Sequence, residues 1–230
     1  MTPKDRLIVA LDVPDLDRAR SLADRLAGSV GMFKVGSELF TAAGPAVVRE
    51  LVSRGERVFL DLKYHDIPNT VAGAVAAASR LGVSLLDVHA LGGRAMLEAA
   101  VAALSTDATR LLAVTILTSH DEEGLCQVGV RTPIQEAVRR LALLAHEAGV
   151  HGAVCSPHEV GLVREVCGPR FLILTPGIRP EGASRGDQSR AATPAAALAA
   201  GADYLVVGRP ITQAPDPRAA AQAILDRMGG

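Results

Sequence analysis

Short runs of apolar residues recur along the chain, with helical patterns between them. The runs occupy residues 7–12, 31–36, 57–63, 85–90, 110–118, 151–156, 170–177 and 203–209. Within each run the residues are almost continuously apolar rather than alternating with polar ones. That pattern is typical of strands in a parallel sheet covered on both faces. The chain is therefore predicted to form eight buried parallel strands.

Helical periodicity is clearest in residues 15–28, 44–55 and 133–149. The first two of these segments end at Gly28 and Gly55, and glycine favours the backbone conformation that ends a helix. Eight strand–helix units in a chain of this length predict an α/β fold, the (β/α)8 TIM barrel. An open doubly wound sheet would usually have fewer strands and a glycine-rich turn after the first strand, where this chain reads LDVPDLD.

Neither a linker nor a low-complexity stretch interrupts the pattern, so residues 1–230 are predicted to form a single barrel domain. Two long loops stand out, at residues 119–132 and at about 179–192. The second reads RPEGASRGDQSRAA, which is glycine-rich, polar and arginine-bearing. We expect it to act as a mobile lid over a phosphate group.

Composition narrows the choice of partners and compartment. The chain has 230 residues, of which 49% are hydrophobic and only 3% aromatic, so an aliphatic core of useful size is expected. The net charge is −1 and both signs are spread along the chain, which argues against nucleic acids and membrane surfaces as partners. Three cysteines without a CxxC pair indicate reduced thiols. The first apolar run is too short for a signal peptide, and a cytoplasmic protein is expected.

Charged residues gather at the C-terminal ends of the predicted strands, where barrel enzymes place their active sites. Asp61 and Lys63 are two residues apart and so project from one face of the third strand, with Lys34 on the neighbouring strand. Asp66 follows shortly before Pro68, which opens the next helix. Buried ion pairs add little net stability because desolvation roughly cancels their attraction. A functional role explains this cluster better than a structural one.

A second group of residues follows the seventh and eighth strands, where such barrels commonly bind phosphate. TPGIR supplies Gly177 and Arg179, and VVGRPIT supplies Gly208 and Arg209. Glycine lets backbone N–H groups approach an anion, and arginine binds it with two parallel hydrogen bonds. Gln188 in the predicted lid is suited to the same anion. Glycine-tolerant turns with solvated arginines are the alternative, but the two motifs together favour phosphate.

The remaining histidines and cysteines give weaker signals. His89 and Asp87 suggest a metal pair, although histidines at strand ends are as often hydrogen-bonded packing groups. His65 is expected to support the geometry of the charged loop. Cys155 precedes Ser156, but no histidine is placed to activate its thiol. No metal site is predicted.

The stretch DLKYHDIPNT, residues 61–70, resembles the DxKxxDIPxT signature of the orotidine 5'-phosphate decarboxylase family. The resemblance continues in family order through ALD, FKVG, VTILTS, VCSP, TPGIR, GDQ and VVGRPIT, and covers essentially the whole chain. It implies loss of CO₂ from C6 of orotidine 5'-monophosphate to give uridine 5'-monophosphate, a step of pyrimidine biosynthesis. It also implies that neither a metal nor an organic cofactor takes part.

The same resemblance implies a role for each matching residue. Lys63 is the proton donor to C6, and Asp61 lies against the departing carboxylate. Lys34 and Asp66 complete a catalytic Lys-Asp-Lys-Asp network, with Asp66 contributed by the partner subunit of a homodimer. The implied substrate-binding residues are Asp12 and Lys34 at the ribose, Thr70 at the ribose across the dimer interface, Thr118 and Ser156 at the base, and Arg179, Gln188, Gly208 and Arg209 at the phosphate.

These implied roles agree with the chemistry. Decarboxylation at C6 leaves an sp² carbanion that no carbonyl group is positioned to delocalise, so the site must stabilise the charge electrostatically. Two rivals stay open. One is a Mg²⁺-dependent sugar-phosphate decarboxylase or aldolase on the same barrel, with Asp61 and Glu38 as ligands. The other is a nucleotide-binding protein without catalytic activity.

Overall fold

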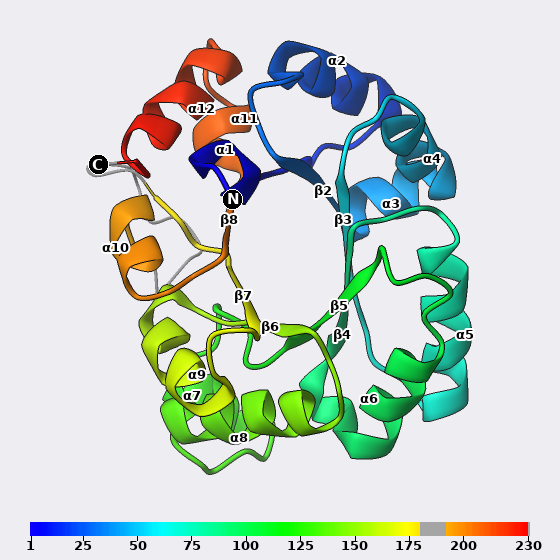
Figure 1. The fold of residues 1–230 in the computed structure, drawn as a ribbon, viewed down its shortest axis with the longest axis vertical. Helices are drawn as coiled ribbons and strands as arrows, with labels where there is room; N and C mark the ends of the chain where they lie inside the picture. Colours follow the sequence, from blue (N-terminus) through cyan, green and yellow to red (C-terminus); the bar gives the residue numbers. More distant parts are fainter. Residues whose placement is uncertain (180–191, 230) are drawn as a thin grey trace.

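Eight parallel strands close into a barrel in sequence order, with helices around the outside (Figure 1). This computed structural model describes residues 1–179 and 192–229. Each predicted apolar run contains one strand, which confirms the (β/α)8 barrel. The strands are β1 (Leu7–Ala10), β2 (Met32–Gly36), β3 (Val58–Tyr64), β4 (Leu85–His89), β5 (Arg110–Val114), β6 (Gly152–Val154), β7 (Leu172–Thr175) and β8 (Tyr204–Val207).

Apart from a short N-terminal helix that precedes β1, the helices follow the strands in the expected alternation. They are α1 (Pro3–Arg6), α2 (Leu16–Leu26), α3 (Ser37–Ala43), α4 (Pro45–Ser53), α5 (Pro68–Ser79), α6 (Gly93–Ala102), α7 (Glu122–Gln127), α8 (Ile134–Glu147), α9 (Val160–Cys167), α10 (Pro194–Ala199), α11 (Arg209–Thr212) and α12 (Pro217–Asp226), with 3₁₀ turns η1 (Ala90–Gly92) and η2 (Pro157–Glu159). After α2 and α4, Gly28 and Gly55 have φ of 73° and 80°, the left-handed conformation that ends a helix. No described helix combines the length and the apolar character needed to span a membrane.

The segment 119–132 is not the open loop that its sequence predicts, because α7 forms within it. Asp121 caps this helix by accepting a hydrogen bond from the Gly124 N–H at 2.8 Å, and buried Leu125 anchors it to the core. At the second predicted loop, Ile178 and Ala192 form an isolated parallel bridge. The rest of the predicted lid, residues 180–191, lies outside the described residues.

Two apolar layers pack against the sheet, one inside the barrel and one between the strands and the helices. Along β1, Leu7 and Val9 belong to the outer layer, whereas Ile8 and Ala10 belong to the inner one. The inner layer consists of Ile8, Ala10, Met32, Phe59, Leu85, Leu112, Val114, Val154, Leu174, Tyr204 and Val206. Because these side chains fill the barrel interior, polar groups gather at the ends of the strands.

One irregularity interrupts the barrel, in the pairing of β3 with β4. Leu60 lies opposite Leu86 and Tyr64 lies opposite Val88, so four steps along β3 match two steps along β4. Lys63 falls in this bulge with φ of 49°, and it is the only non-glycine residue with positive φ in the described ranges. Bulges of this kind redirect side chains and are common next to active sites.

Gly152 on β6 offers a test of how tightly the barrel is closed. A Cβ atom added there would overlap the Leu172 carbonyl oxygen and lie 2.6 Å from the Leu172 Cβ on β7. We expect Gly152→Ala to lower the free energy of unfolding by about 1–3 kcal/mol, because two paired strands must separate slightly. Denaturant titration measures this change.

Gly161→Ala is the matched control, because a Cβ atom at this position in α9 meets nothing within 4 Å. Its free energy of unfolding should stay the same or rise by up to about 1 kcal/mol. Equal stability of Gly152→Ala and the unaltered protein would contradict the close β6–β7 contact.

Candidate active site

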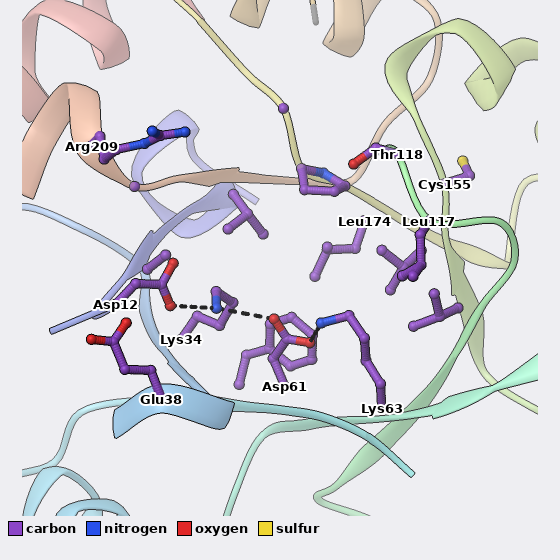
Figure 2. Close-up of a pocket in the computed structure, with 18 of the residues that line it drawn as sticks. Asp12, Lys34, Glu38, Asp61, Lys63, Leu117, Thr118, Cys155, Leu174 and Arg209 are labelled. Carbon is purple, nitrogen blue, oxygen red and sulfur yellow. Dashed lines mark hydrogen bonds and ion pairs between the residues drawn. The ribbon is translucent and has the colours of Figure 1, made fainter. Parts of the chain in front are cut away.

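A cavity of about 490 Å³ opens at the carboxyl ends of the strands (Figure 2). Its apolar part includes Ala10, Phe59, Val114, Val154, Leu174 and Val206, which come from six different strands. Its charged part consists of Asp12, Lys34, Glu38, Asp61, Lys63, Arg179 and Arg209. An apolar base with a few convergent charged groups is the usual form of a small-molecule site.

Four charged side chains of alternating sign form a row along one side of this cavity. The Lys34 Nζ lies 2.9 Å from Asp12 Oδ1 and 3.0 Å from Asp61 Oδ2. The other oxygen of Asp61 forms an ion pair with the Lys63 Nζ. Figure 2 shows the row running from Asp12 through Lys34 and Asp61 to Lys63. Each interior member is thus held by a neighbour on either side.

The row keeps its central members ionised despite their burial. Burial opposes the charge on Asp61, but Lys34 and Lys63 outweigh it and hold the pKa of this carboxyl well below its usual range. Burial likewise opposes the charge on Lys34, but Asp61 and Asp12 outweigh it and raise the pKa of this ammonium. Both groups are therefore charged throughout the physiological pH range.

Lys63 is more exposed to the cavity than the two central members of the row. Its side chain retains 36% of its exposure, against 11% for Asp61 and 10% for Lys34. The bulge in β3 presents it, and its backbone N–H donates a 2.8 Å hydrogen bond to Asp87 Oδ1 on β4. A ligand in the cavity therefore meets the Lys63 ammonium before the groups behind it.

Two arginines line the cavity beyond the ends of β7 and β8. Arg179 follows Gly177, which has φ of 76°, and Arg209 begins α11 directly after Gly208. Burial, together with the positive charge of Arg209, lowers the pKa of the Arg179 guanidinium. An anion between the two side chains would relieve their repulsion. Gln188, predicted to act here, lies outside the described residues.

The predicted base-binding residues differ in their position. Thr118 lines the cavity, whereas Ser156 is fully buried and is not among the lining residues. The Ser156 hydroxyl accepts a 3.3 Å hydrogen bond from the His158 N–H and so caps the 3₁₀ turn η2. Its neighbour Cys155 lines the cavity instead.

Asp66 and Thr70 lie outside the cavity of their own chain. Both are exposed, and Asp66 Oδ1 accepts a 2.6 Å hydrogen bond from the Ile67 N–H at the start of α5. The structure therefore brings Asp12, Lys34, Asp61 and Lys63 together, and it leaves Asp66 and Thr70 on the outer surface.

Several residues at the cavity were not predicted from the sequence. Thr212 and Gln213 reach the cavity because α11 is short and begins at Arg209. The contact of Asp87 with the Lys63 backbone was also missed, although a carboxylate inside the apolar run LLDVH was a visible signal. Within the described ranges, no three His, Cys, Asp or Glu side chains are grouped to hold a metal ion.

Known proteins resemble this chain over nearly all of its length. The model of the "Orotidine 5'-phosphate decarboxylase / HUMPS family" matches residues 5–224. A Moorella thermoacetica protein named orotidine 5'-phosphate decarboxylase is 60% identical, over 97% of this chain and 92% of its own. A Geobacter sulfurreducens protein of the same name is 54% identical, over 98% of this chain and 96% of its own.

A solved structure extends this similarity to three dimensions. The orotidine 5'-phosphate decarboxylase of Lactobacillus acidophilus matches with a TM-score of 0.87 and 40% identity, covering 97% of this chain and 99% of its own. Sequence and fold thus agree across the whole barrel, including the strands that carry the charged row. The chain belongs to the orotidine 5'-phosphate decarboxylase / HUMPS family.

Proposed function

We propose that this protein decarboxylates orotidine 5'-monophosphate to uridine 5'-monophosphate in pyrimidine biosynthesis. The observation that carries the proposal is the row of alternating charges at the open end of the barrel, which ends in the accessible ammonium of Lys63. The relatives that match nearly the whole chain support it, since they are named for this activity.

The reaction places a specific demand on Lys63. The bond between C6 and the carboxylate breaks, CO₂ leaves, and the electron pair stays on C6. The Lys63 ammonium stabilises this developing carbanion and then transfers a proton to C6, so each turnover consumes one proton. Because the pair cannot spread into a carbonyl group, this electrostatic contribution is the main one available.

Asp61 has two effects in this scheme. It fixes the Lys63 ammonium through their ion pair. It also lies beside the substrate carboxylate, whose negative charge it repels until that charge leaves with CO₂. Repulsion present in the bound substrate but relieved in the transition state lowers the barrier.

The rest of the cavity positions the nucleotide. In this proposal Arg179, Arg209, Gly208 and Gln188 hold the phosphate. Asp12 and Lys34 hold the ribose hydroxyls, and Thr118 addresses the base above the apolar part of the cavity. The distance between the phosphate group and C6 lets binding energy at one end orient the reacting atom at the other.

The proposal includes a homodimer in which Asp66 and Thr70 of each subunit serve the partner's site. Their exposure outside their own cavity supports this arrangement. Ile67, between them in sequence, is 67% exposed, and Leu91 after β4 is 46% exposed. Large apolar side chains at these positions suit a surface that another subunit covers.

The Mg²⁺-dependent alternative fits the geometry poorly. Both oxygens of Asp61 are already occupied by ammonium groups, from Lys34 and Lys63. A divalent cation at Asp61 would have to displace at least one of them against charge repulsion. Nothing in the described part of the chain favours a purely nucleotide-binding role over turnover.

Purified protein, exhaustively treated with a chelator, should lower the absorbance of orotidine 5'-monophosphate and release one CO₂ per uridine 5'-monophosphate formed. Lys63→Ala should reduce kcat by about 10⁴-fold or more, because it removes both the charge and the proton donor. Its thermal stability should be unchanged or higher, since active-site charges are often held at a cost in stability.

Lys4→Ala is the control for that variant, because Lys4 is exposed on α1, outside the residues that line the cavity. Its turnover should equal that of the unaltered protein. Near-normal turnover in Lys63→Ala would reject the mechanism, and absence of turnover in the unaltered protein would reject the function.

Arg209→Ala should raise KM by about 10- to 100-fold, the loss expected for a charged hydrogen bond to a non-reacting phosphate. Inhibition constants for uridine 5'-monophosphate and uridine measure the effect, and the preference for the phosphorylated ligand should shrink. Arg140→Ala, on the exposed face of α8, is the control. An unchanged preference for the phosphorylated ligand in Arg209→Ala would show that the phosphate binds elsewhere.

Mixing the Lys63→Ala and Asp66→Ala proteins tests the shared site. If Asp66 serves the partner, each mixed dimer has one site with both lesions and one with neither. Random reassortment should leave about one quarter of all sites intact, and so restore about one quarter of the wild-type activity. Mass-labelled subunits verify that exchange has occurred, and no recovery after verified exchange would reject the shared site while leaving the decarboxylase function standing.

A further inference from the structure

Asp87 is a carboxyl group buried where the fold offers it little solvation. It lies in the middle of β4 with no exposed surface. The β5 residues opposite Asp87, Val88 and His89 are Leu112, Ala113 and Val114, all apolar. Burying an isolated carboxylate in such surroundings costs several kcal/mol. A penalty of about this size makes protonation favourable.

One oxygen of Asp87 compensates for the bulge in β3. The bulge takes the Lys63 N–H out of the regular pairing with β4, and Asp87 Oδ1 accepts this N–H at 2.8 Å. The contact also holds Lys63 at φ of 49°, a conformation that lysine adopts only under restraint. Without this acceptor the backbone would be free to relax and carry the ammonium away from its position.

The other oxygen, Oδ2, is buried, and no N–H or O–H group of the described residues donates to it. The Asp61 carboxyl lies close enough to that of Asp87 for its negative charge to act on it. Two carboxyl groups can share a hydrogen bond only when one of them carries a proton. Asp61 is paired with two ammonium groups, whereas Asp87 forms no ion pair in residues 1–179 or 192–229. The proton therefore belongs on Asp87.

We propose that Asp87 is a positioning residue that acts as a neutral carboxylic acid. One oxygen accepts the Lys63 N–H, and the other donates its proton to the Asp61 carboxylate. Asp87 thereby fixes both ends of the Asp61–Lys63 pair, the backbone of the proton donor and the carboxylate that orients its ammonium. This proposal deepens the proposed decarboxylation and rests on it only for the kinetic test below.

The surrounding charges agree with a neutral Asp87. Burial and the negative charge of Asp61 raise the pKa of the Asp87 carboxyl, and the positive charge of Lys63 only partly opposes this. The other titratable groups nearby are Tyr64 on β3 and His89 on the same strand. Burial raises the pKa of Tyr64 and lowers that of His89 to about 4, so both are neutral at pH 7.

The kinetic test compares Asp87→Asn with Asp87→Ala. An asparagine amide presents one acceptor and one donor, the same pattern as a protonated carboxyl, so kcat should stay within about threefold. Alanine removes both contacts, and kcat should fall by about 10²-fold, the cost of misplacing a catalytic group by an ångström, with KM little changed. A large loss of kcat in a folded Asp87→Asn protein, or none in Asp87→Ala, would overturn the proposal.

The stability test does not depend on catalysis. An aspartate in the unfolded chain loses its proton near pH 4, whereas a neutral native Asp87 keeps it. The folding equilibrium constant of the unaltered protein should therefore fall relative to Asp87→Asn by about tenfold per pH unit as pH rises from about 5, until native Asp87 ionises. A ratio that does not change with pH would mean that Asp87 is charged in the native state and would overturn the proposal.

Thr109→Val is the matched control, because Thr109 is also buried and its hydroxyl donates a 2.7 Å hydrogen bond to the Val83 carbonyl, away from the cavity. This variant should lose stability by a factor that does not change with pH, and its kcat should be normal. Failure of the decarboxylase assay itself would remove only the kinetic test, and the pH dependence of folding would still decide the state of Asp87.

Discussion

The arrangement of the active site depends on one buried carboxylate, that of Asp61, held between two ammonium groups. Alone, a carboxylate at this depth would take up a proton, and either lysine without it would lose the charge that compensates for its own in a partly apolar cavity. Together the three groups stay charged, and each fixes the position of the next. Charges that are already oriented do not need to reorganise when a carbanion forms, which is why a site of this kind accelerates the reaction.

The barrel makes this row possible because it brings the four side chains in from three adjacent strands, β1, β2 and β3. Lys34 and Asp61 come from β2 and β3, whose register places Gly36 opposite Asp61. Asp12 follows β1, whose Ala10 pairs with Lys34. Below them the apolar interior excludes water, so attraction within the row is stronger than it would be at the surface. Packing and catalysis thus share the same strands but occupy different levels of the barrel.

Most of this architecture could be predicted from the sequence, because few other folds are compatible with eight continuous apolar runs. The spacing of Asp61 and Lys63 predicted that both project from one face of a regular strand. Both line the cavity, but the strand between them is not regular. The bulge between them arises from pairing with β4, a long-range interaction without a local signature. For the same reason the sequence suggested only a possible metal pair of Asp87 with His89, since the partner of Asp87 is a backbone group 24 residues away in sequence. The helix α7 was missed because it has only six residues and one buried anchor.

The left-handed backbone at Lys63 bears on how this position changes over evolutionary time. Glycine and, to a lesser degree, asparagine and aspartate adopt that conformation readily, whereas lysine does not. Folding alone would thus favour another residue here, and only turnover retains the lysine. In a duplicated copy released from selection for catalysis, substitution at position 63 by glycine or asparagine would relieve strain and leave the barrel intact. Loss of activity in such a lineage would begin at the centre of the site, with a gain in stability.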